Sequence, residues 1–163
     1  MSCETGLDDP LLSEVYAYWR SKCAARRMPA RRDIDPGEMP KLLPHLLLSE
    51  VAPGGRFRYR LSGTAVAHAL RQDVTGRCVE EVTSGAYCDH LNALQRTVCC
   101  EGAPLFAASL LPCGARTKYR FTRRLLLPLA DDGATVNQIL SLVVFQFGVG
   151  TPALTRLDAV TAG

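Results

Sequence analysis

Two stretches of the chain repeat apolar residues at intervals of three and four positions, which is the spacing of one face of an α-helix. They are residues 9–25, with Leu12, Val15, Tyr16, Trp19 and Cys23, and residues 84–101, with Tyr87, Leu91, Leu94 and Val98. We therefore predict two amphipathic helices. Capping residues predict two shorter helices, one from Asp35 to Leu43 and one after Gly63.

Other stretches are rich in β-branched and aromatic residues and are bounded by turn residues, which indicates strands. Five strands are predicted, at residues 46–51, 56–61, 105–111, 117–127 and 136–147. Two strands, then helices, then three strands indicate an α+β domain that has an antiparallel sheet with helices packed on one face.

The strands at 46–51 and 139–147 are apolar at nearly every position instead of at alternate positions. An antiparallel sheet normally leaves one face to water, so this pattern means that both faces must be covered. We expect the helix at 9–25, from the same chain or from a partner subunit, to cover the second face. The strand at 56–61 and the strand that carries Pro128 should then lie nearer the edges.

Length and composition favour one folded domain without a membrane span. The chain has 163 residues, 47% of them hydrophobic, and no apolar run of the length that a membrane helix needs. Its N-terminus is acidic and lacks the features of a signal peptide. The seven cysteines form no CxxC pair, which disfavours zinc and suits free thiols in a reducing compartment. We therefore expect a cytoplasmic protein that has no metal site and no membrane partner.

The net charge of +3 is too small to indicate nucleic-acid binding. The basic residues nevertheless gather in two blocks, which we expect to be solvated surfaces. They are Arg20, Lys22, Arg26, Arg27, Arg31 and Arg32, and then Arg116, Lys118, Arg120, Arg123 and Arg124. Arg27 and Arg31 have the R-x-x-x-R spacing of cyclic dinucleotide receptors, but the companion motif of those receptors is absent.

Six short strings occur in the order typical of one family. They are Tyr18-Trp19-Arg20, Met28-Pro29-Ala30-Arg31-Arg32-Asp33-Ile34-Asp35-Pro36, Leu42-Leu43-Pro44-His45, Phe57-Arg58-Tyr59-Arg60-Leu61-Ser62-Gly63-Thr64, Asp73-Val74-Thr75-Gly76-Arg77 and Arg124-Leu125-Leu126-Leu127-Pro128-Leu129-Ala130. With these strings the chain resembles a bacterial family of small, stand-alone PAS-like domains. The resemblance implies a five-stranded antiparallel PAS sheet and a sensory or protein-interaction role, without catalysis. The expected layout is an N-terminal helix for capping or dimerisation at 1–26, a PAS-like domain at 27–150 and a C-terminal tail at 151–163.

In such a fold the expected ligand pocket lies between the inner face of the sheet and the helices after Gly63, with an apolar lining and a few polar groups. The candidate ligand-binding residues are Tyr59, His68, Tyr87, Leu91, Phe106, Tyr119, Phe121 and Asn137. The alternative is that these side chains only fill the core, because protein interiors are closely packed without ligands.

Other chemistry has weaker support. His90, six residues before Arg96, is placed similarly to the haem ligand of oxygen-sensing PAS domains. Cys88 or the Cys99–Cys100 pair would sense oxidation if their thiolates were stabilised. Structural roles are the alternative for each of them. The sequence has no glycine-rich phosphate loop, nucleophile elbow or metal-ligand motif, so we predict no catalytic residues and no enzymatic activity.

These patterns together predict a regulatory domain that binds a small molecule or a partner protein and signals through dimerisation or protein interaction. The expected partners are a second copy of the chain and a signalling protein, and the sequence identifies neither the ligand nor a cofactor. The residues expected to form the dimer interface are Leu12, Val15, Tyr16 and Trp19. The alternative is a constitutive adaptor that has a filled core and needs no ligand.

Overall fold

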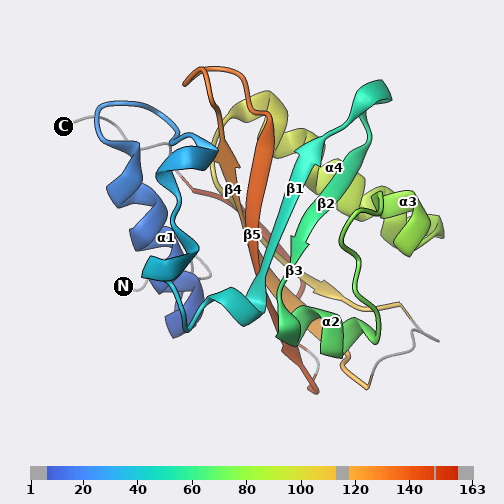
Figure 1. Cartoon of the computed structure of the whole chain (residues 1–163). Coiled ribbons are helices and arrows are strands. Elements are labelled where there is room, and N and C mark those ends of the chain that lie inside the picture. The colour runs from blue at the N-terminus through green and yellow to red at the C-terminus, as the bar shows by residue number, and fades with distance from the viewer. Residues whose placement is uncertain (1–6, 113–117, 149, 158–163) are drawn as a thin grey trace.

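A single antiparallel sheet forms the centre of the molecule (Figure 1). In the computed structural model, which describes residues 7–112, 118–148 and 150–157, the sheet has six strands in the order β2-β1-β5-β4-β3-β6. Their bounds are β1 Leu46–Val51, β2 Phe57–Ser62, β3 Leu105–Leu110, β4 Phe121–Leu129, β5 Gln138–Gln146 and β6 Ala153–Arg156. The five predicted strands are confirmed, and β6 adds a sixth within the segment expected to be a tail.

The helices also follow the predicted pattern. They are α1 Pro10–Cys23, α2 Thr64–Leu70, α3 Val79–Val82 and α4 Gly85–Glu101. The single short helix predicted from Asp35 to Leu43 is instead two 3₁₀ turns, Pro36–Glu38 and Leu43–His45. Pro40 lies inside the predicted span, where its missing N–H and its ring disrupt a continuous helix.

Helices cover both faces of the sheet, as the apolar central strands required. Figure 1 shows α1 on one side of the sheet and α2, α3 and α4 on the other. β1 and β5 are paired with each other inside the sheet, and the middle of each strand is buried. We call the side covered by α2–α4 the inner face and the side covered by α1 the outer face.

α1 is fixed at its start and in its third turn by specific hydrogen bonds. The Asp9 carboxylate caps the helix by accepting from the backbone N–H of Leu11 at 2.8 Å, and Pro10 occupies the first turn. Deeper in the molecule the Trp19 indole Nε1–H donates to the backbone carbonyl of Pro128 at 2.9 Å. This buried bond attaches α1 to β4.

The expectation that the strand with Pro128 lies near an edge is wrong for the strand as a whole. β4 is internal, between β5 and β3, but β3 pairs with it only as far as Leu126. Beyond that point the Pro128 carbonyl bonds to Trp19 and not to a strand. The backbone N and C=O of one residue point to the same side of a strand. Because the Pro128 carbonyl faces Trp19 and not a strand, the N–H that proline lacks would also have faced no strand, and the sheet loses no hydrogen bond.

The structure also places the residues expected at a dimer interface. Leu12, Val15 and Trp19 have no exposed surface, because α1 packs them against the chain's own sheet, and Tyr16 is half-buried. While α1 stays in this place, Leu12, Val15 and Trp19 are not available to a second copy. The cover of the outer face is the chain's own helix.

Trp19→Phe should destabilise the fold, because it leaves the buried Pro128 carbonyl without a donor and shortens the aromatic side chain. We expect the free energy of unfolding to fall by about 2 kcal/mol or more. Urea unfolding followed by far-ultraviolet circular dichroism measures it, since Trp19 is the only tryptophan and fluorescence would be lost. The control Tyr18→Phe removes exposed hydrogen bonds on the same helix and should cost about 0.5 kcal/mol or less. Equal losses in the two variants would contradict the role given to Trp19.

Candidate functional site

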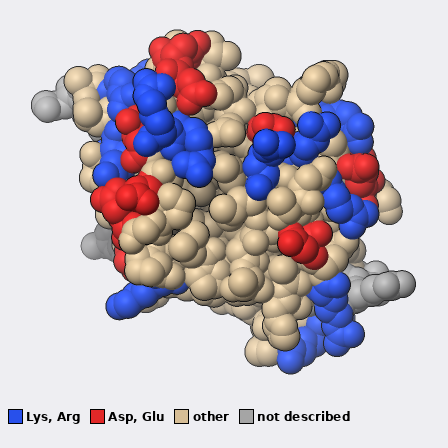
Figure 2. Space-filling view, in the orientation of Figure 1, with Lys and Arg blue, Asp and Glu red and all other residues tan. Residues whose placement is uncertain are grey.

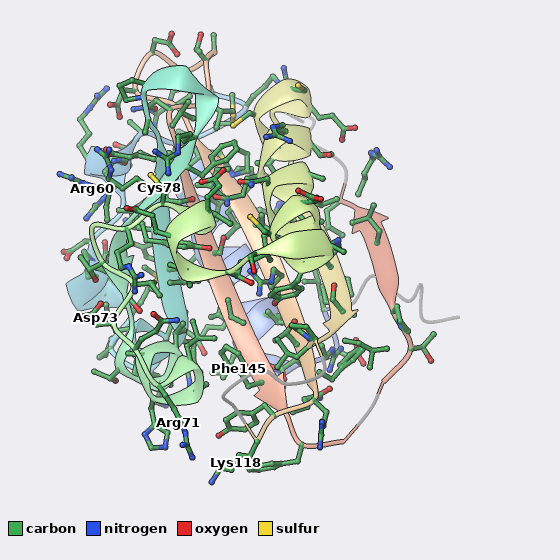
Figure 3. The ribbon with its side chains drawn as sticks, turned by 90° about the vertical axis from the view of Figure 1, so that its right-hand side faces the viewer. Arg60, Arg71, Asp73, Cys78, Lys118 and Phe145 are labelled. Carbon is green, nitrogen blue, oxygen red and sulfur yellow. The ribbon has the colours of Figure 1, made fainter. Side chains whose placement is uncertain are left out.

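A pocket of about 400 Å³ lies between the inner face of the sheet and helices α2, α3 and α4. Figure 3 faces this side of the molecule, where Arg71 follows α2 and Phe145 lies on β5. Most of the lining is apolar, and the lining residues are Leu47, Tyr59, Val66, Leu70, Arg71, Gln72, Val74, Val82, Thr83, Tyr87, Leu91, Leu111, Pro112, Arg124, Val143 and Phe145. The pocket therefore lies in the region where the sequence predicted a ligand site, between the sheet and the helices after Gly63.

The alternation of β4 and β5 places a mixed set of side chains on the pocket wall. Val143 and Phe145 are two positions apart on β5, so both point to the inner face, and Arg124 pairs directly with Val143 across the sheet. Leu47 of β1 and Tyr59 of β2 extend the same wall. One arginine thus stands on an otherwise mainly apolar sheet face.

Arg124 is buried, with only 9% of its surface exposed. Its Nη2 donates to the Tyr87 hydroxyl at 3.3 Å, a contact that joins β4 to α4. Among the described residues no carboxylate lies within ion-pair distance of Arg124. A guanidinium keeps its charge at all ordinary pH values, so the pocket wall carries a permanent positive charge.

Tyr59 brings a hydroxyl to the same pocket. Its side chain is buried, and burial raises the pKa of the phenol to about 12, while the positive charge of Arg124 opposes that rise. Tyr59 is therefore protonated at neutral pH and keeps an O–H donor. Together with the Tyr87 hydroxyl, it gives the pocket neutral hydrogen-bonding groups in addition to the charge of Arg124.

Three of the eight candidate ligand-binding residues lie at this pocket: Tyr59, Tyr87 and Leu91. His68 is exposed on α2, outside the lining. Asn137 closes the turn before β5, where its amide donates to the Asp131 carboxylate at 2.9 Å. Neither His68 nor Asn137 belongs to the pocket.

The other three candidates are aromatic residues that pack elsewhere. Phe106 is on the outer face, beneath Arg123, whose guanidinium also pairs with Asp8 just before α1. Phe121 is two residues from Arg123 on β4 and so faces the same side. Tyr119 contacts Phe145 with ring centroids 5.5 Å apart, but it is not part of the lining.

Sequence reasoning missed Arg124, the most distinctive polar group of the pocket, because it was grouped with a solvated basic block. The signal that was available is its neighbourhood, since it directly precedes the apolar run 125–130. Such an apolar run indicates a strand that is covered on both faces. A charged residue at the start of this strand therefore faces one of the covers.

The remaining basic residues mostly have local structural roles. Arg26 pairs with Asp33 at 2.8 Å and Lys22 with Glu38 at 3.0 Å. Arg27 donates to the carbonyl of Glu101 at the end of α4. On the face of the molecule that Figure 2 draws, Asp and Glu side chains lie among the Lys and Arg side chains. Arg116, from the second block, lies outside the described residues.

A second, more open groove of about 660 Å³ runs between α4 and the strands β3 and β6. His90 lies in this groove and not in the inner pocket, with its Nε2 2.8 Å from the Ser109 hydroxyl. Burial lowers the pKa of His90 below 6.5, and the charge of Arg124 lowers it further. In the described residues no carboxylate hydrogen-bonds to this imidazole, so the pair lacks the third group that orients a histidine base.

Burial disfavours the thiolate at Cys88 and Cys99. Burial raises the pKa of Cys99 to about 11. The pKa of Cys88 is also raised, mainly by burial and in addition by the negative charges of Glu80 and Asp89. Both thiols therefore stay protonated at neutral pH, which disfavours oxidation at these positions. Cys23, Cys78, Cys88, Cys99 and Cys100 are free, while Cys3 and Cys113 lie outside the described residues.

The described residues lack two features, a metal-binding cluster and a membrane-spanning helix. No group of three or more histidine, cysteine or acidic side chains is arranged to hold a metal ion. None of the helices has both the length and the apolar composition needed to cross a membrane.

A family model described as a PAS domain matches residues 7–144. The match begins just before α1 and ends within β5, so it includes α1–α4, β1–β4 and most of β5. No curated protein matches the chain.

The lowered pKa of His90 predicts a pH dependence of stability. Below pH 6.5 the unfolded chain binds a proton at this residue that the folded chain resists, so the free energy of unfolding should fall from pH 6.5 toward the folded pKa. Above pH 6.5 both states are neutral here and the effect vanishes. Urea midpoints at about pH 7.5 and about pH 5.5 should differ less in His90→Gln than in the unmodified protein.

The control for this prediction is His68→Gln, the same change at an exposed site on α2. It should keep the pH dependence of the unmodified protein. If His90→Gln and the unmodified protein lost the same stability between the two pH values, His90 would not be the group that resists protonation.

Proposed function

The chain belongs to the PAS domain family, and we propose on this basis that it is a sensory domain whose inner pocket binds a small molecule. The observation that carries the proposal is the pocket of about 400 Å³ between the sheet and α2–α4. Family membership supports a sensory or regulatory role in general, and the pocket supports a ligand.

The size and lining of the pocket are those of a small-molecule site. Such sites are concave, have volumes of roughly 300–1,000 Å³ and are mostly apolar with a few placed polar groups. Close packing normally leaves few voids larger than a water molecule in a protein interior. A constitutive adaptor with a filled core has no need of this space, so the pocket favours the sensory function over the adaptor.

α4 is suited to pass on the state of the pocket. Tyr87, in its first turn, lines both the inner pocket and the groove beside β3 and β6. A ligand that draws Arg124 away from the Tyr87 hydroxyl changes a contact between β4 and α4. We propose that occupancy shifts the population of α4 positions and that a partner protein reads the shift.

Leu70→Trp should block ligand entry, because Leu70 is half-buried in the pocket lining on α2 and a larger side chain there occupies the cavity. The probe is N-phenyl-1-naphthylamine, a neutral dye that fluoresces in apolar sites. We expect the dye to bind the unmodified protein, and its affinity to fall about tenfold or more in Leu70→Trp.

Leu154→Trp is the matched control, since it makes the same change on β6 at an exposed position of the second groove, between α4 and the strands β3 and β6. It should leave dye binding unchanged. Loss of binding in Leu154→Trp with full binding in Leu70→Trp would place the ligand in the second groove, beside β3 and β6, and contradict the proposal. Native mass spectrometry of the purified protein gives a second readout, because a retained ligand adds mass.

A further inference from the structure

We infer that the ligand of the inner pocket is an amphipathic organic acid, whose carboxylate binds Arg124 and whose apolar chain or ring fills the rest of the cavity. The inference rests on the proposed function, since it names the class of ligand for that same pocket. Three observations carry it: the buried charge of Arg124, the lack of a counter-ion for it among the described residues, and the arrangement of donors and apolar side chains around the cavity.

The first observation is that Arg124 is buried and almost unpartnered. Its side chain has five N–H donors, and the only partner found for them in the described residues is the Tyr87 hydroxyl at 3.3 Å. A buried charge is costly unless it is paired with an opposite charge and hydrogen-bonded. The guanidinium is at the pocket wall, so a bound anion would supply both.

The second observation is that the described part of the chain supplies no anion at the pocket. The lining includes two arginines, Arg124 and Arg71, and no acidic residue. Glu80 is close enough to affect the pKa of Tyr59, but its carboxylate pairs with Arg56 at 3.5 Å and accepts from the Asn92 amide at 3.0 Å. The field inside the pocket is therefore positive and favours an anionic ligand over a neutral or cationic one.

The third observation is that the lining combines a few hydrogen-bond donors with an apolar wall. Arg124 and the hydroxyls of Tyr59 and Tyr87 provide donors, and a guanidinium fork matches a carboxylate through two parallel hydrogen bonds. The remaining buried wall is aliphatic, with Leu47, Val66, Val74, Leu91 and Val143. An inorganic anion would leave this apolar surface uncovered, whereas an organic acid matches both parts.

The test compares three probes that share one eight-carbon chain and differ in their head group: octanoate, octan-1-ol and octylammonium. Isothermal titration calorimetry on the full chain measures their affinities. Charge-assisted hydrogen bonds to Arg124 should make octanoate bind about tenfold or more tightly than octan-1-ol. Octylammonium should bind more weakly than octan-1-ol, because the pocket is positive.

Variants then locate the preference. Arg124→Met should lower octanoate affinity by about tenfold or more and leave that of octan-1-ol nearly unchanged. Arg123→Met is the matched control, because Arg123 is the next residue on the same strand but faces Asp8 on the outer face. It should keep the preference. Arg124→Lys keeps the charge without the fork and should give an intermediate affinity, which provides a second variant if Arg124→Met does not fold.

A separate readout distinguishes a binding residue from a structural one. Without ligand, Arg124→Met should unfold at an equal or higher urea concentration than the unmodified protein, because an apolar side chain replaces an unpaired buried charge. A marked loss of stability in a folded Arg124→Met variant would show that Arg124 serves the fold, and would overturn the inference.

The outcomes separate the inference from the proposed function. Equal affinities for octanoate and octan-1-ol would overturn the acid class while the pocket still binds a ligand. An octanoate preference that persists in Arg124→Met would overturn the assignment to Arg124. If none of the three probes binds and the dye does not bind either, both the inference and the proposed function are wrong.

Discussion

The structure depends on a sheet whose central strands are apolar on both faces. β1 and β5 lie side by side, and the two faces of this pair present leucine, isoleucine and valine side chains with little polar interruption. Neither face can be left to water, so the chain must provide two covers. α1 is one cover and α2–α4 are the other, which explains why an N-terminal helix far from β4 in the sequence packs against it.

The two covers are built differently, and the proposed ligand site lies under the more loosely packed one. On the outer face, the space among Leu46, Leu48 and Leu140 is only about 20 Å³, and α1 is held by the buried bond from Trp19 to Pro128. On the inner face, the helices leave about 400 Å³ open. Tight packing on one side makes the sheet a rigid support, against which a cavity on the other side keeps its shape.

The sequence predicted the elements well because their signals are periodic. The spacing of Leu12, Val15 and Trp19 identified α1, and the nearly continuous apolar runs of β1 and β5 indicated that the sheet is covered on both faces. The position of the pocket was predicted only as a region, and its lining only in part. Phe106 and Phe121 are aromatic residues in predicted strands, as Tyr59 is, but the alternation of side chains along each strand places them on the outer face. Parity along a strand shows which residues share a face, and it does not show which face has the cavity.

Arg124 illustrates why local sequence was insufficient. In the sequence it follows Arg123, and the two look alike as members of a basic block. In the structure Arg123 reaches Asp8 on the outer face, while Arg124 lies under the helices without a carboxylate partner in the described residues. An unpaired buried charge lowers stability, and an aliphatic side chain of similar length would avoid that cost. Natural proteins tolerate such a cost mainly where a site needs the group for binding or chemistry. The position of this cost, on the wall of the inner cavity, therefore supports the proposed ligand site on the inner face.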